Sequence, residues 1–153
     1  MVEQFAKTVD NGEFVARIIF SPSYVYKGRV APTAFRWEIL PSGTAEDYIS
    51  VLRGDTKALD EQTKNFKART AGDKRYGYAL LSVEKVRDIG RDNELGVPTI
   101  VDVLAYPSKA HPNHAGIVIT MDNNRVTALS PLTPEIMMAQ NRLASLCSEI
   151  VKF

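Results

Sequence analysis

The two histidines of the chain, His111 and His114, lie in the segment 108–117 (SKAHPNHAGI). Pro112 stands between them and disfavours a helix, so we expect a loop at His111 and a strand that begins at His114. At the mouth of a strand, the fold holds one side of an imidazole ring while the other side meets solvent, which suits acid–base catalysis. His114 is therefore the candidate catalytic residue, and His111 is a candidate ligand-binding residue. The alternative is a structural pair, in which His114 caps a turn and His111 faces water.

The other residues that commonly carry chemistry form no recognised pattern. A zinc site needs a third and usually a fourth ligand, and Asp102, Asp122 and Cys147 stand at no diagnostic spacing from the histidines. The sequence also contains no P-loop, no G-x-G-x-x-G and no G-x-S-x-G motif. We therefore expect neither a metal nor a cofactor.

An aromatic and basic segment lies near the N-terminus, at residues 23–29 (SYVYKGR). Tyrosine faces and guanidinium donors suit the binding of phosphate, nucleotides or RNA, and Tyr and Arg are also enriched at protein interfaces. Candidate residues for binding a ligand or a protein partner are Tyr24, Tyr26, Arg29 and Arg36. The alternative is an exposed turn with one tyrosine packed against the core.

A cluster of basic residues lies in the middle of the chain, next to Tyr76 and Tyr78. Basic side chains with aromatic neighbours can bind RNA or DNA, here through residues 53–78. Against this, the whole chain has 19 Lys and Arg and 18 Asp and Glu, a net charge of +1, and so has no global preference for nucleic acid. The members of the cluster are Lys64, Lys67, Arg69, Lys74 and Arg75.

The sequence pattern predicts an α+β fold with a mainly antiparallel sheet, because strands and helices are mixed without a regular βαβ alternation. Runs of β-branched and aromatic residues predict the strands Glu13–Phe20, Asp47–Arg53, Tyr76–Ser82, Val97–Tyr106 and Ala115–Thr120. We also expect Val30–Leu40 to be extended, with an interruption at Pro32, after a loop over Ser21–Arg29.

Helices are expected at three places. The first covers Asp55–Arg69, after the early strands, and a short one covers Val83–Ile89. The longest covers Thr133–Val151, where Pro134 occupies the first helical turn and the apolar residues recur with a helical period. This C-terminal helix should pack on the sheet, with Cys147 on its apolar face.

Length and composition predict one globular domain over residues 1–153, since 44% of the residues are hydrophobic and 24% are charged. No apolar run approaches the ~18 residues of a membrane span, and residues 1–7 lack the apolar stretch of a secretory signal. A lone cysteine cannot form an internal disulfide, which fits a reducing compartment. We expect a cytoplasmic protein that does not enter the membrane.

Three short pieces occur in an order that is similar to a group of small uncharacterised bacterial proteins. The first is G-R-V-x-x-x-A-F at residues 28–35, followed by Arg36; the second is Ile49-Ser50-Val51; and the third is H-A at residues 114–115, which begins a late strand. The resemblance spans about residues 21–119 and implies a bacterial or phage-borne cytosolic protein. The positions that match are Arg29, Phe35, Arg36, Ser50 and His114. It suggests that Arg29 or Arg36 could meet His114, as an anion clamp and an acid–base group.

Residues 114–119 (HAGIVI) also resemble the histidine strand of NlpC/P60-like cysteine peptidases and acyltransferases. In permuted members the histidine precedes the cysteine, as His114 precedes Cys147 here. The family's cysteine opens a helix, whose positive end lowers the thiol pKa. Cys147 is instead expected inside the last helix, which fits a buried structural thiol.

Three functions follow as hypotheses. Because recognised catalytic motifs are absent, we first expect a binding protein, acting as an adaptor, immunity or accessory component of a partner system. The second hypothesis is a small enzyme that acts on a nucleotide or an acyl or peptide bond, with His114 as its acid–base group. The third is an RNA- or DNA-binding module that uses residues 53–78.

Overall fold

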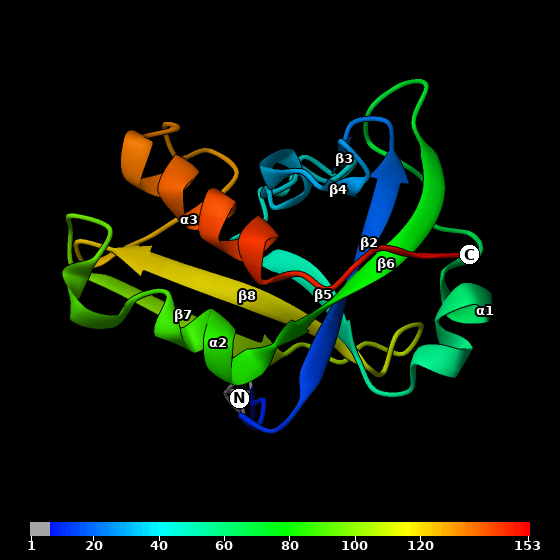
Figure 1. Cartoon of the computed structure of the whole chain (residues 1–153), viewed down its shortest axis with the longest axis horizontal. Helices are drawn as coiled ribbons and strands as arrows, with labels where there is room; N and C mark the ends of the chain where they lie inside the picture. The colour runs from blue at the N-terminus through cyan, green and yellow to red at the C-terminus, as the bar shows by residue number, and fades with distance from the viewer. Residues whose placement is uncertain (1–6) are drawn as a thin grey trace.

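The computed structural model describes residues 7–153. Of residues 1–7, where we expect no secretory signal, all but Lys7 lie outside the described residues. One eight-stranded sheet dominates the fold, in the order β1-β7-β8-β5-β2-β6-β10, with β9 beside β8 (Figure 1). Every strand pair in it is antiparallel. The expected α+β class with a mainly antiparallel sheet is confirmed.

The longer strands of the sheet lie where the apolar runs predict them. The strands are β1 (Lys7–Thr8), β2 (Phe14–Ser21), β5 (Ile49–Arg53), β6 (Lys74–Ser82), β7 (Thr99–Ala105), β8 (His114–Met121), β9 (Asn124–Arg125) and β10 (Val151–Lys152).

The segment between β2 and β5 is less extended than the sequence predicts. A small separate hairpin, β3 (Val25–Tyr26) with β4 (Arg29–Val30), turns at Lys27 and Gly28, whose φ angles are 50° and 76°. The 3-10 turn η1 (Pro32–Ala34) follows. The interruption expected at Pro32 is therefore present as a tight turn, and the rest of the expected extended segment has an isolated bridge between Ile39 and Ala45.

Two helices cover one face of the sheet (Figure 1). The longer, α3 (Pro134–Leu146), is capped by the Thr133 hydroxyl, as expected, and docks through buried Ile136, Ala139 and Leu143. The shorter, α2 (Val83–Asp88), buries its apolar residues in the same core. Alternate residues of the central strands point to this face and complete the core.

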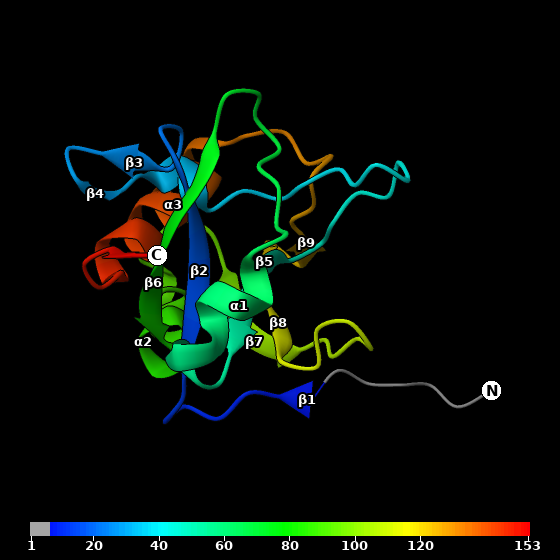
Figure 2. The same ribbon diagram turned by 90° about the vertical axis from the view of Figure 1, so that its right-hand side faces the viewer.

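The opposite face of the sheet carries a smaller apolar cluster. The turn η2 (Thr56–Ala58) and the short helix α1 (Leu59–Thr63) lie against this face (Figure 2). Leu59 packs there with Ala16, Ile18 and Leu52. The helix expected over Asp55–Arg69 begins at its aspartate cap but ends at Thr63, so its expected C-terminal half is wrong. The Thr63 hydroxyl donates to the Leu59 carbonyl, and the chain then turns to place Phe66 on the cluster.

The C-terminal helix is also shorter than the sequence predicts. It ends at Leu146, and Cys147 is its extended C-cap and not a helical residue. The chain continues as β10, in which Val151 pairs with Tyr78 and Lys152 with Gly77. A Cβ atom on Gly77 would lie 2.3 Å from the Val151 carbonyl oxygen, so the glycine makes room for this strand. Pairing with β6 therefore overrides the helical period after Leu146.

Within residues 7–153, the structure contains no helix with the length and apolarity required to cross a bilayer.

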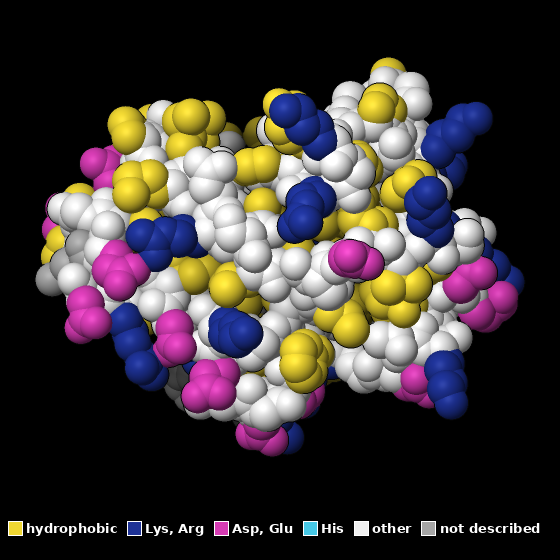
Figure 3. Space-filling view, viewed as in Figure 1, with side chains coloured by type: hydrophobic (Ala, Val, Ile, Leu, Met, Phe, Trp, Pro, Cys, Tyr) yellow, Lys and Arg dark blue, Asp and Glu magenta, His cyan; other side chains and the backbone are white. Residues whose placement is uncertain are grey.

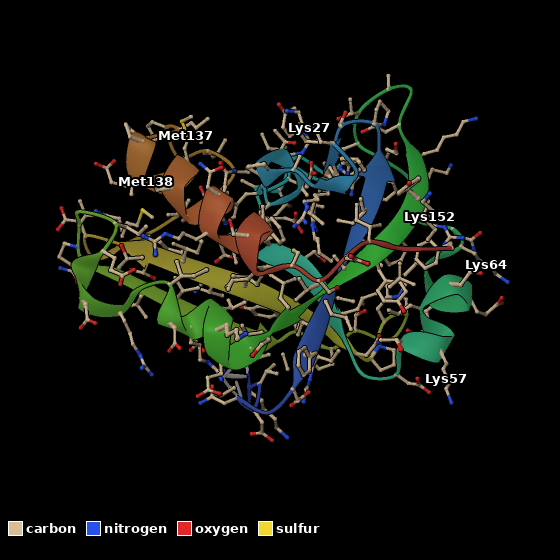
Figure 4. All side chains as sticks on the ribbon, in the orientation of Figure 1. Lys27, Lys57, Lys64, Met137, Met138 and Lys152 are labelled. Atoms are coloured by element: carbon tan, nitrogen blue, oxygen red, sulfur yellow. The ribbon has the colours of Figure 1, made fainter. Side chains whose placement is uncertain are left out.

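Replacement of Leu143 by Ala tests the docking of α3. Because Leu143 is fully buried, we expect the free energy of unfolding, measured with urea, to fall by about 2–5 kcal/mol. Met137 lies on the outer side of the same helix (Figure 4) and is 48% exposed, so Met137→Ala should cost less than about 1 kcal/mol. Equal losses for the two variants would contradict this docking.

Candidate functional site

The site begins where β2 and β5 part. These two strands pair only at Val15 with Arg53 and at Ala16 with Leu52, although both continue beyond that point. The Arg17 side chain fills the gap that follows: its Nε donates to the Ala34 carbonyl at 2.8 Å, and its Nη1 donates to the Ser50 carbonyl at 2.7 Å. Hydrogen bonds from one side chain thus take the place of the missing strand pairing.

Arg17 is buried, with 7% of its surface exposed. Its guanidinium carbon lies 5.5 Å from the centre of the Tyr24 ring, and that of Arg36 lies 5.4 Å from the same ring. Arg17 forms no ion pair with any carboxylate of residues 7–153. Burial lowers its pKa, and Tyr24 and Glu38 oppose that effect. Burying such a cation without an anion costs on the order of several kcal/mol.

A cavity of about 400 Å³ opens at this gap, and we call it the β2–β5 cavity. The charged residues of its lining are three cations, Arg17, Lys67 and Arg69, and two carboxylates, Glu38 and Glu46. The remaining lining residues are Ala16, Ile18, Phe20, Tyr24, Ser50, Val51, Leu52, Asn65 and Phe66. The cavity is thus partly apolar, with charged side chains of both signs.

The two carboxylates of the β2–β5 cavity differ in their surroundings. Glu38 accepts from Nε of Arg36 at 3.1 Å and from the Tyr24 hydroxyl at 3.2 Å, so Arg36 balances its charge. Glu46 accepts from the backbone N–H of Glu38 at 3.2 Å, and burial raises its pKa. Glu46 is therefore neutral over a wider pH range than an exposed glutamate.

Ser50 and His114 form a hydrogen-bonded pair. The Ser50 Oγ lies 2.6 Å from Nε2 of His114, while Nδ1 of His114 lies 3.1 Å from the carbonyl oxygen of Tyr106. A carbonyl oxygen can only accept, so Nδ1 carries the proton of the neutral ring and Nε2 accepts from the Ser50 hydroxyl. This is the tautomer that a general base for Ser50 needs.

Neighbouring strands and two tyrosines position this pair. Ser50 is opposite Gly116 and His114 is opposite Leu52 in the β5–β8 register, so both side chains leave the same face of the sheet. Tyr48 stacks on Tyr106 at 4.6 Å and presents its ring edge-on to His114 at 5.6 Å. A Cβ atom on Gly116 would lie 2.8 Å from both tyrosines, so only glycine leaves room for this stack.

The residues of the aromatic segment lie apart from the Ser50–His114 pair. Tyr24 is buried between the two arginines and is therefore not part of an exposed aromatic surface, whereas Tyr26 is 63% exposed. Arg29 is exposed on the β3–β4 hairpin. Arg36 reaches the β2–β5 cavity only through Glu38. His111 stacks edge-on against Phe66, a cavity residue, at 5.1 Å.

The basic cluster divides into three parts. Lys64 pairs with Glu61 on the outer side of α1 (Figure 4), and Arg75 pairs with Asp60 at 2.7 Å. Lys74 is exposed at the start of β6. Lys67 and Arg69 line the β2–β5 cavity. The five residues therefore do not form a single unpaired basic surface.

Cys147 is not paired with His114. Its Sγ contacts the Leu143 carbonyl at 3.5 Å, and it packs against the core beneath α3. Burial raises the pKa of the thiol to about 12, which keeps it protonated at neutral pH. Within residues 7–153, no group of three His, Cys, Asp or Glu side chains is arranged to hold a metal ion.

Arg17 is not among the sequence-based candidates, and Ser50 is among them on one ground only. Arg17 stands in the apolar run FVARIIF, where strand alternation assigns it to the same face as buried Val15 and Ile19. A charge at a core position is itself a signal that something polar is nearby. Ser50 was marked only by the resemblance to bacterial proteins, since nothing local distinguishes it from other strand serines.

A second hollow lies on the α3 side of the molecule. This α3 pocket, of about 560 Å³, is lined mainly by apolar groups between η1, residues 126–132 and α3. Leu132 and Met137 line this pocket and are 64% and 48% exposed, and exposed Leu129 and Met138 are next to its lining residues in the chain. Apolar side chains gather on the surface over the N-terminal half of α3 (Figure 3). Trp37 lines this pocket, and its buried Nε1–H has no hydrogen-bond partner within residues 7–153.

No family model matches the chain, and no curated protein or solved structure is significantly similar to it. The geometry of the two hollows is therefore what indicates a function.

The pKa of His114 gives a pH test of the site. Burial, and to a smaller degree His111, lower this pKa below 6.5, against the effect of the Tyr106 carbonyl. The neutral ring thus stabilises the fold fully above pH 6.5, and this stability is lost as the pH falls from 6.5 through the folded-state pKa. We expect His114→Gln to flatten the pH dependence of unfolding in that window, measured by denaturant titration. Identical pH profiles for the two proteins would contradict the buried neutral imidazole.

Proposed function

We propose that this chain is a small enzyme that transfers or hydrolyses an acyl group, with Ser50 as nucleophile and His114 as general base. The observation that carries the proposal is the 2.6 Å contact between Ser50 Oγ and His114 Nε2, in a ring whose other nitrogen is held by a carbonyl oxygen. A serine hydroxyl is a weak nucleophile by itself, and an adjacent oriented base is what activates it.

The reaction proceeds in two steps. Ser50 Oγ attacks the acyl carbonyl carbon while its proton passes to His114 Nε2; the leaving group then departs and takes that proton from the imidazolium. In the second step His114 takes a proton from water or another hydroxyl acceptor, whose oxygen attacks the acyl–Ser50 ester. The imidazolium then returns this proton to Ser50 Oγ as the ester bond breaks and the acyl product leaves. The Tyr106 carbonyl stabilises the imidazolium as it forms, in the place that a carboxylate takes in a catalytic triad.

Position and environment support this proposal. Ser50 lines the β2–β5 cavity, so an acyl group bound there lies next to the nucleophile. Lowering of the His114 pKa keeps the imidazole unprotonated, and hence able to act as a base, at neutral pH. Lys67 and Arg69 bring positive charge to the same cavity, where negative charge develops on the acyl oxygen during attack.

Hydrolysis of an activated aryl ester tests the proposal. We expect Ser50→Ala and His114→Ala each to lower kcat/KM by about 10²- to 10⁴-fold, because each removes one member of the nucleophile–base pair. The double variant should lose no more than the single variants, since the two residues act as a unit.

Ser42→Ala is the matched control. Ser42 is an exposed loop serine whose hydroxyl contacts only Thr44 among the described residues, so this variant should keep the wild-type rate. Thermal unfolding would confirm that all variants are folded. Hydrolysis by folded Ser50→Ala at the wild-type rate would refute the assignment.

A second candidate function, binding of another protein, is supported by the apolar rim of the α3 pocket. Four large apolar side chains there are 40% to 74% exposed, and on a protein surface such a group commonly marks an interaction site. This surface replaces the tyrosine-rich segment as the place where a partner would dock. The two functions separate experimentally, because Ser50→Ala removes acyl transfer and leaves the α3 surface intact.

A further inference from the structure

We infer that the β2–β5 cavity holds an anionic group of the substrate, a carboxylate or a phosphate, and that Arg17 recognises it. The inference rests on the proposed function, because the cavity is the one that Ser50 lines, and it names the class of substrate. The feature behind it is Arg17 itself, a cationic residue of which only 7% is exposed and which lines an open cavity.

Arg17 has hydrogen-bonding capacity to spare. A guanidinium carries five N–H donors in a planar fork, and here one Nε–H and one Nη1–H are used, on the Ala34 and Ser50 carbonyls. Its Nη2 has no hydrogen-bond partner within residues 7–153. A carboxylate or phosphate presents the two acceptor oxygens that match the free part of such a fork.

The charges around Arg17 also favour an anion. Lys67 and Arg69 line the same cavity, and neither forms an ion pair in the described part of the chain. Of the two lining carboxylates, Glu38 is paired with Arg36 from outside the cavity, and burial raises the pKa of Glu46. The cavity therefore has more positive charge than its own carboxylates balance.

The position of Arg17 connects the anion with the reaction. Its Nη1 lies 2.7 Å from the carbonyl oxygen of Ser50, the residue whose hydroxyl contacts His114. Because Arg17 and Ser50 line the same cavity, an anionic group held there would leave the rest of the substrate within reach of the proposed nucleophile. The substrate class is thus an acyl compound that bears a second, negatively charged group.

Titration of the purified protein with inorganic phosphate and, separately, with acetate tests the inference. Binding is measured by isothermal calorimetry, with sodium chloride added to constant ionic strength. We expect saturable binding of at least one anion, and the one that binds more tightly identifies the group that the substrate carries. Arg17→Met should weaken this binding by about 10- to 100-fold, because a charge-assisted hydrogen-bonding partner is lost.

Because Arg17→Met removes a residue that joins two strands, the double variant Lys67→Ala/Arg69→Ala provides a test that leaves the core unchanged. It should weaken anion binding by about tenfold. Lys57→Ala removes an exposed lysine of η2 that is not part of the cavity (Figure 4) and should bind as the wild type does. Absence of saturable binding of either anion, or wild-type binding by the double variant, would overturn the inference.

The same titration separates this inference from the proposed function. Ser50→Ala keeps the backbone carbonyl that Arg17 contacts, so it should bind the anion as the wild type does. Anion binding without ester hydrolysis by the wild type would leave Arg17 as an anion site and remove the acyl-transfer proposal. Ester hydrolysis without anion binding would keep the acyl-transfer proposal and remove Arg17 as an anion site.

Discussion

A buried guanidinium joins two strands of one sheet at the point where their pairing stops. Arg17 reaches the carbonyls of Ala34 and Ser50, and thereby ties β2, the turn η1 and β5 together without a continuous ladder. Backbone carbonyls that would otherwise be buried without partners are satisfied. The cost is a desolvated cation, which Tyr24 reduces by presenting its ring face.

The arrangement of the site follows from that gap. Because β5 has β8 as a full partner on its other side, Ser50 is held in register with the strand that carries His114. The open side of β5 becomes the wall of a cavity. One edge of the strand thus holds Ser50, the proposed nucleophile, against His114, its proposed base, while the other edge borders the cavity. If β2 and β5 were paired along their whole length, Ser50 would keep its place opposite β8, but the cavity would be closed.

The sequence pattern predicts the class of the fold and its longer strands because those elements bury alternating or continuous apolar runs, as β2 and β8 do. It fails at the helix ends, where tertiary contacts decide. Beyond the end of α1, Phe66 packs on the smaller apolar cluster of the sheet, and the pairing of Val151 with Tyr78 draws the C-terminal segment into the sheet. Neither contact has a local signature.

For the site, the sequence identifies His114 by its type and its place before a strand. It does not identify the contact with Ser50, because the two residues are 64 positions apart and only the β5–β8 register brings them together. Tyr24 looks like a binding residue in the sequence but lies buried between Arg17 and Arg36. The sequence does not show that Arg17 and Arg36 meet on this ring, because only the fold brings the three side chains together.

The most direct test of the central claim, that His114 activates Ser50, is covalent labelling with a sulfonyl fluoride followed by peptide mass spectrometry. We expect one label per molecule, on Ser50, and a large loss of labelling in His114→Ala. Labelling spread over several exposed hydroxyls, or labelling of Ser50 that is unchanged when His114 is replaced, would show that the pair is structural and not catalytic.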